Sequence, residues 1–169
     1  MRDEDQTTHI AHVNWATLVA DAQSPRVASF FAAVDRVNAL AERSAGFVWR
    51  DGSERSHAVA IGWPLFVQNP RLIASFSVWQ TPQALADYVF KTVHGAFLRR
   101  AAEWFEPGSG GHALWPVRAG HIPDMAEAQD RVTRLERTGP CNEVFTLDTL
   151  CLGRPDARDG ETSPRPAPV

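Results

Sequence analysis

The stretch that decides the fold runs from Leu72 to Phe105 and reads LIASFSVWQTPQALADYVFKTVHGAFLRRAAEWF. Its first part, Leu72 to Trp79, is apolar and predicts a strand. Thr81 and Pro82 then supply the start of a helix that the pattern predicts from Pro82 to about Phe105. This helix carries His94 on its apolar face. A strand followed at once by such a helix is typical of small α+β proteins that enclose a ligand pocket.

Periodicity and turn signals predict the other elements. They are a strand from His9 to Leu18, a helix from Ser24 to Gly46, a strand from Phe47 to Arg50, an irregular or edge element from Ala58 to Val67, a strand from Ala113 to Val117, a helix from Asp124 to Gly139 and a short strand from Val144 to Leu147. The order β-α-β-β-α-β predicts a ferredoxin-like α+β fold with an antiparallel sheet. Residues 9–150 form the expected domain, after a polar lead at residues 1–8 and before a disordered tail at residues 151–169.

Both faces of the predicted sheet need cover. Neither of the two alternating sets of side chains in the strand from Leu72 to Trp79 is charged. Helices in this order are expected to cover one face only, so a second copy of the chain is expected to cover the other. The sequence therefore predicts a homodimer with a barrel-like interior, that is, a dimeric α/β barrel.

Composition argues against several classes of partner. The 169 residues carry 17 Lys and Arg against 20 Asp and Glu, which leaves no basic surface for nucleic acid. No apolar run approaches the ~20 residues of a membrane span, and the acidic start MRDEDQTTH lacks the features of a signal peptide. Cys141 and Cys151 form neither a C-x-x-C pair nor a disulfide framework. We expect a cytoplasmic protein without nucleic-acid or membrane partners.

Alternation along the first strand places His12 and Asn14 on one face and Ala11, Val13 and Trp15 on the other. Two polar side chains that face the same way indicate a wet or ligand-lined side. An amide that merely satisfies a neighbouring backbone group is an equal alternative for Asn14.

The remaining histidines and motifs are less informative. His9 and His12 have an H-x-x-H spacing, but strand residues three apart point to opposite faces, so no metal site is predicted. His57 and His112 lie in predicted loops and carry no signal. The chain has no G-x-G-x-x-G, no Walker loop and no G-x-S-x-G. Nucleotide-cofactor and serine-hydrolase functions therefore lack their minimum motifs, and any chemistry must rely on the pocket and on the substrate itself.

His94 is a stronger candidate because Phe90, Phe97 and Leu98 surround it at helical spacing. Burial on that face favours a neutral imidazole, which can act as a general base or ligate haem iron. A core histidine that is satisfied by a backbone carbonyl is about as frequent. His121 lies in a turn before a helix start, where it predicts either a pocket rim for an anionic ligand or plain turn chemistry.

Five segments resemble the DUF3291 family of uncharacterised proteins, which is grouped with the dimeric α/β-barrel proteins. They are HIAHVN (His9 to Asn14), NALAERSAGFVWR (Asn38 to Arg50), SVWQTPQAL (Ser77 to Leu85), VHGAFLRRAAEWFE (Val93 to Glu106) and AGHIP (Ala119 to Pro123). The wider superfamily includes cofactor-independent monooxygenases of antibiotic biosynthesis, haem-degrading enzymes and haem peroxidase-like proteins. In its haem-degrading branch, an Asn on the first strand, a Trp on the third and a His on the following helix act together. Asn14, Trp79 and His94 resemble these three.

The resemblance implies a cofactor-independent, monooxygenase-like enzyme, or a related cyclase or isomerase, that acts on a small aromatic or polyketide-like metabolite. The Ala- and Arg-rich composition is typical of a high-GC bacterium with secondary metabolism. Predicted catalytic residues are Asn14, Trp79 and His94, and predicted substrate contacts are His12, Ser75, Ser77, Phe90 and His121. The alternative role for Trp79 is packing in the core, without a part in the chemistry. A haem protein that uses His94 and a non-catalytic small-molecule-binding protein are the rival functions.

Overall fold

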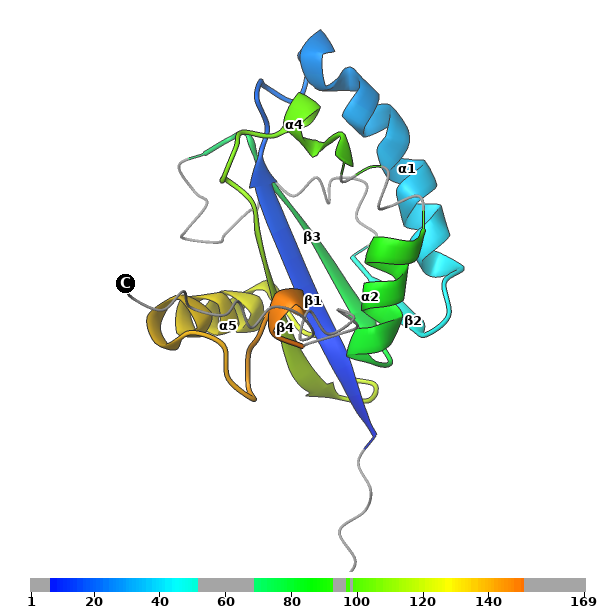
Figure 1. Cartoon of the computed structure of the whole chain (residues 1–169), viewed down its shortest axis with the longest axis vertical. Helices are drawn as coiled ribbons and strands as arrows, with labels where there is room; N and C mark the ends of the chain where they lie inside the picture. The colour runs from blue at the N-terminus through cyan, green and yellow to red at the C-terminus, as the bar shows by residue number, and fades with distance from the viewer. Residues whose placement is uncertain (1–6, 52–68, 93–96, 98, 151–169) are drawn as a thin grey trace, which may run out of the picture.

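The computed structural model describes residues 7–51, 69–92, 97 and 99–150 (Figure 1). Its elements are β1 (Thr8–Thr17), η1 (Pro25–Val27), α1 (Ala28–Glu42), β2 (Phe47–Arg50), β3 (Leu72–Trp79), α2 (Pro82–Lys91), α4 (Ala101–Trp104), β4 (Gly111–Arg118), α5 (Met125–Thr138) and η2 (Leu147–Leu150). Residues 1–6, the predicted element Ala58 to Val67, His57 and the predicted tail lie outside the described residues.

Four antiparallel strands form one sheet in the order β2-β3-β1-β4. The central pair, β1 and β3, runs in register from Ile10 opposite Trp79 to Thr17 opposite Leu72. With α1 between β1 and β2, and α2 between β3 and β4, this is the split βαβ arrangement of a ferredoxin-like fold. The predicted fold class is confirmed. Pro116 is tolerated in β4 because that strand lies at a sheet edge.

The first helix has the predicted start and stop signals, but α1 itself is shorter than the predicted range from Ser24 to Gly46 and spans Ala28–Glu42. The Ser24 hydroxyl accepts a hydrogen bond from the Arg26 N–H, and Pro25 opens the 3-10 turn η1 that leads into α1. Gly46 then turns the chain into β2 with a φ of 79°. A Cβ at this position would lie only 2.5 Å from the Cβ of Ala84, so glycine is needed both for its backbone angle and for its small size.

The second helix starts as predicted but ends early. Thr81 Oγ1 accepts a hydrogen bond from the Ala84 N–H, with Pro82 at the first helical position. The expectation of one helix from Pro82 to about Phe105 is wrong, because α2 ends at Lys91 and Thr92 has an extended backbone. The Thr92 hydroxyl donates to the Tyr88 carbonyl, which the Thr92 N–H would bond in a continuing helix.

On one face of the sheet, α1 and α2 pack around a buried cluster that includes Ile10, Trp79 and Leu114. Trp79 is 1% exposed and Leu114 is fully buried. The sequence assigned all helices to this face.

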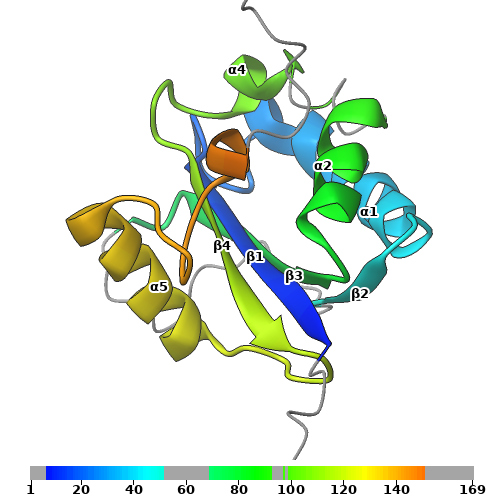
Figure 2. The same ribbon diagram turned by 60° about the horizontal axis from the view of Figure 1, so that its bottom comes forward.

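The other face is covered by α5, so the expectation of a single covered face is wrong (Figure 2). Ala128 and Val132 of α5 pack against this face of the sheet and are 0% and 1% exposed. Phe76 and Val78, which β3 presents on the same face, are 8% and 0% exposed within the single chain. A second copy of the chain is therefore not required to bury them.

Local signals set the ends of α5 as predicted. The Asp124 carboxylate accepts a hydrogen bond from the Glu127 N–H at its start, and Gly139 ends it with a φ of 72°. The strand predicted from Val144 to Leu147 is reduced to two isolated bridges, Phe145 with Leu114 and Val144 with Cys141, after which the chain forms η2. None of the helices in the described part of the chain combines the length and the hydrophobicity needed to cross a bilayer.

Candidate functional site

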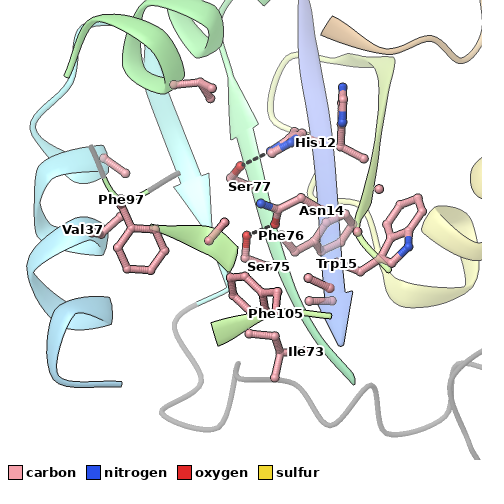
Figure 3. Close-up of a pocket in the computed structure, with 18 of the residues that line it drawn as sticks. His12, Asn14, Trp15, Val37, Ile73, Ser75, Phe76, Ser77, Phe97 and Phe105 are labelled. Carbon is pink, nitrogen blue, oxygen red and sulfur yellow. Dashed lines mark hydrogen bonds between the residues drawn. The ribbon is translucent and has the colours of Figure 1, made fainter. Parts of the chain in front are cut away.

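A cavity of about 650 Å³ lies between the sheet and the helices α1, α2 and α4 (Figure 3). This volume falls within the range of small-molecule sites in proteins. β1, β3 and the start of β4 form its floor, and helical side chains form its roof. Figure 3 shows Asn14, Ser75 and Ser77 on the sheet, facing Val37 and Phe97.

The floor is polar because the register of β1 and β3 brings together two cross-strand pairs. His12 lies opposite Ser77, and Asn14 lies opposite Ser75. Residues opposite each other in a sheet point to the same face, so all four side chains line the cavity. The predicted shared face of His12 and Asn14 is confirmed.

Asn14 and Ser75 are joined by a hydrogen bond in which the Ser75 hydroxyl donates to Asn14 Oδ1. Ser75 is exposed although it lies on a central strand, which means that the cavity opens over it. Since the amide oxygen of Asn14 is engaged, its amino group is the part of the side chain that can donate to a ligand.

A second chain of contacts joins Trp79, Ser77 and His12. The Trp79 Nε1–H donates to Ser77 Oγ at 3.0 Å, and Ser77 Oγ lies 3.4 Å from His12 Nδ1. The Trp79 ring is 1% exposed and stacks on Tyr88 with ring centroids 5.1 Å apart. Trp79 therefore acts on the floor through Ser77, and its burial favours the packing alternative over direct contact with a reacting atom.

His112 also lines the cavity, although the sequence placed it in a loop without signal. That placement is wrong because β4 begins at Gly111 and pairs His112 with Asn14. The predicted strand began one residue too late, at Ala113. The sequence signal that could have found His112 is the alternation of the strand: His112 lies two residues before the buried Leu114, so the two side chains share one face of the sheet.

Hydrogen bonding and burial define the state of the His112 ring. Its Nε2 accepts a hydrogen bond from the Leu147 N–H at 3.1 Å. Burial lowers the pKa of His112, and the nearby Asp148 carboxylate opposes this effect. The His112 and His12 rings are 6.4 Å apart between centroids.

The roof is apolar and aromatic. Val34 and Val37 of α1 line the cavity together with three phenylalanines, Phe30, Phe97 and Phe105. The Phe30 ring contacts the other two, with centroids 5.6 Å and 5.2 Å away. A planar apolar molecule would have aromatic contacts above and hydrogen-bonding groups below.

Tyr88 and Arg50 complete the wall next to α2. Burial raises the pKa of the Tyr88 hydroxyl well above its usual range, and the Arg50 charge lowers it by less. The hydroxyl donates to the Val37 carbonyl at 3.3 Å, so Tyr88 stays protonated. Arg50 forms an ion pair with Glu42 at 2.7 Å.

The sequence matches the family described as Domain of unknown function (DUF3291) over residues 9–159. The chain belongs to the DUF3291 family. No curated protein sequence matches it.

Several solved structures are similar to this DUF3291 member. The NE2512 protein of unknown function from Nitrosomonas europaea is 12% identical over 70% of this chain and 98% of its own, with a TM-score of 0.47. A variant of SnoaB, a cofactor-independent oxygenase from Streptomyces nogalater, is 17% identical over 69% and 98%, with a TM-score of 0.45. A monooxygenase from the gene ActVA-Orf6 of Streptomyces coelicolor, in complex with nanaomycin D, is 14% identical over 70% and 95%, with a TM-score of 0.39.

The other predicted site residues of this DUF3291 member lie in different places. Phe90 borders the cavity but is 62% exposed, so it belongs to the rim. His121 lies outside the cavity lining, and its Nε2 is 2.6 Å from Glu127 Oε2 on α5, which packs on the opposite face of the sheet. The turn after β4 carries it away from the predicted rim. His94 lies outside the described residues.

The haem alternative requires an imidazole nitrogen that can bind iron. His112 does not offer Nε2, because that nitrogen accepts the Leu147 N–H. His94, the predicted iron ligand, lies outside the described residues, so haem binding stays a prediction that a Soret band on addition of hemin tests. Within the described part of the chain, no three His, Cys, Asp or Glu side chains gather as a metal-binding group.

Proposed function

We propose that this DUF3291 member is an enzyme that binds a small aromatic or polyketide-like metabolite in the cavity. It acts on that molecule without a cofactor, by oxygenation or by a related cyclisation or isomerisation. The observation that carries the proposal is the cavity itself, whose apolar roof faces a floor that contains Asn14, Ser75 and His12. Such a cavity holds a flat apolar body and orients it through a few polar groups.

The proposed chemistry begins with removal of a proton from a CH2 carbon of an electron-rich substrate. The carbanion forms a C–O bond with molecular oxygen, the oxidant, and protonation gives a hydroperoxide. Loss of water, which carries away the second oxygen atom and the second hydrogen of that carbon, leaves a carbonyl group. His94 is the proposed base, as inferred from the sequence. Asn14 lies on the floor, where its amino group can donate to a substrate oxygen that gains charge when the proton leaves. His12, Ser75 and Ser77 are the proposed substrate contacts, and Trp79 positions Ser77.

An oxygen-electrode assay with hydroxynaphthalenes and hydroxyanthracenes tests the proposal. We expect oxygen uptake that depends on the protein, and a loss of about 100-fold in kcat/KM for Asn14→Ala, as is typical when one donor to a developing charge is removed. Glu136→Ala, an exposed change on α5, is the matched control and keeps full activity. Unchanged turnover in both Asn14→Ala and His94→Ala contradicts the proposed roles. Tight binding of these compounds without turnover supports the non-catalytic alternative.

A homodimer stays part of the proposal, but the need to cover a second sheet face does not support it. The sequence predicted that this face would be uncovered in a single chain, whereas α5 packs on it within the same chain. Light scattering tests the assembly directly. A mass near twice 18.7 kDa supports a dimer that forms through another surface, and a mass near 18.7 kDa removes it.

A further inference from the structure

Asn14 and His112 form a small polar niche in the cavity floor between β1 and β4. They are opposite each other in the register of these two strands, so their side chains stand next to each other on the cavity face. Both residues line the cavity. We call this pair the β1–β4 niche.

The Asn14 side of the niche offers a hydrogen-bond donor. The amide has one accepting oxygen and one donating amino group. Ser75, on the opposite side of β1 from His112, donates its hydroxyl proton to Oδ1. The Nδ2 amino group is the donor that Asn14 can direct to a ligand oxygen.

The His112 side also offers a donor. A neutral imidazole carries one proton, and the nitrogen without it accepts. Because Nε2 accepts the Leu147 N–H, the proton of the neutral ring lies on Nδ1. Burial lowers the pKa of His112 and so favours this neutral ring, while Asp148 acts in the opposite direction.

Among the described residues, His12 and Asp148 are the ionisable groups for which an interaction with the His112 ring is seen, and Arg50, Asp51, Tyr88 and Glu106 line other parts of the same cavity. His12 lies two residues before Asn14 on β1, and Asp148 lies on η2. Asp148 is exposed, so solvent screens its charge. The niche therefore presents two N–H donors, Asn14 Nδ2–H and His112 Nδ1–H, to a ligand in the cavity.

We propose that the β1–β4 niche binds the deprotonated hydroxyl of the substrate, a phenolate or enolate oxygen, through Asn14 Nδ2–H and His112 Nδ1–H. Hydrogen bonds from N–H donors to a negatively charged oxygen are about twice as strong as those to a neutral hydroxyl, and the niche offers a neutral hydroxyl no acceptor for its own proton. The inference rests on the proposed function for placing the substrate in this cavity. It adds the form in which the substrate binds and a role for His112.

Nitrogen-15 NMR of the histidine rings tests the His112 side without any ligand. We expect His112 at neutral pH to be a neutral ring protonated at Nδ1, with the signal assigned by its absence in His112→Gln. A ring protonated at Nε2, or a doubly protonated ring, overturns the inference.

Binding of 4-nitrophenol, with its methyl ether 4-nitroanisole as the matched probe, tests the niche itself. We expect the bound phenol to be deprotonated at a lower pH than the free phenol, which its absorbance reports. We also expect the phenolate to bind at least about tenfold more tightly than the ether, the ratio typical of one hydrogen bond to a charged group. Equal binding of the two probes, or no binding of the phenolate, overturns the inference.

Two variants separate the donor role of His112 from its structural contact with Leu147. His112→Gln places an amide oxygen near the position of Nε2, so it can keep the Leu147 contact, but it lacks the donor at Nδ1. His112→Asn places an amino group near the position of Nδ1 and gives up the Leu147 contact. We expect the phenolate preference to fall at least fivefold in His112→Gln and less in His112→Asn. The reverse order overturns the donor role.

These readouts are independent of turnover. If the protein binds 4-nitrophenolate as expected but consumes no oxygen with any substrate, the proposed oxygenation fails and the niche stands. If oxygen uptake is found and the phenolate preference is absent, the niche fails and the oxygenation stands.

Discussion

At the scale of single residues, hydrogen bonds within the protein engage one polar atom of each of the side chains Asn14, Ser77 and His112 on the cavity floor. Ser75 occupies the oxygen of Asn14, Trp79 donates to Ser77, and the Leu147 N–H occupies Nε2 of His112. These contacts determine which donors face a ligand, namely Nδ2–H of Asn14 and Nδ1–H of His112. Trp79 is 1% exposed, and a buried N–H group is costly when it lacks a partner, so its hydrogen bond to Ser77 also stabilises the floor.

Burial of His112 has a consequence for stability. Its pKa is lowered in the folded protein, so the unfolded chain binds the proton more readily as the pH falls. The free energy of unfolding should therefore decrease as the pH falls through about 6.5, the ordinary histidine pKa, and continue to decrease down to the lowered folded value. Urea unfolding at pH 7.5 and 5.5 measures this, and His112→Gln should lose less stability between these pH values than the wild type. An equal loss in both proteins would contradict the effect.

Strand alternation was enough to predict that His12 and Asn14 share a face, because this depends only on the period of a strand. It was not enough to predict that His112 lies beside Asn14. The pairing of β1 with β4 is set by contacts between segments about 100 residues apart, and a one-residue error at the start of β4 removed His112 from consideration. The hydrogen bond from Trp79 Nε1–H to Ser77 likewise could not be predicted, because it depends on the rotamers of both side chains.

At the scale of elements, the helix starts were predictable because their signals are local. Thr81 and Asp124 both cap helices as expected. The end of α2 at Lys91 was missed because the apolar pattern continues past it, while the Thr92 hydroxyl takes the carbonyl needed for the next helical turn. The position of α5 on the second face was also missed, since a helical pattern shows which face is apolar but not which surface covers it.

Val132→Ala tests the packing of α5 on the second face. Val132 is 1% exposed in the cluster with Ala128 and Trp115, so loss of its two methyl groups should lower the free energy of unfolding by about 2 kcal/mol. Glu136→Ala, exposed on the same helix, should change it by less than about 0.5 kcal/mol. Urea denaturation of both variants measures the difference. Equal effects would mean that α5 does not pack as described.

At the scale of the whole molecule, the two faces of the sheet differ. The α5 face is a filled core in which Ala11, Val13 and Val78 are 0% exposed. The opposite face carries both a packed cluster and the cavity of about 650 Å³. The order of strands and helices could be read from the sequence, but this asymmetry could not, because it depends on where each helix docks. The sequence argument for a dimer failed for the same reason.

One substitution made on each side of β1 tests this asymmetry. Ala16 faces the cavity and Ala11 faces the filled core, and both are alanines on the same strand. Ala16→Phe should be accommodated with a change of less than about 1 kcal/mol in the free energy of unfolding, because the ring enters open space. It should also weaken 4-nitrophenol binding, because it takes up part of the cavity. Ala11→Phe should cost about 3 kcal/mol or prevent folding, because a close-packed core has no room for a ring. Urea denaturation and probe titration of the two variants give the comparison, and similar stabilities would mean that the cavity is not an open space in solution.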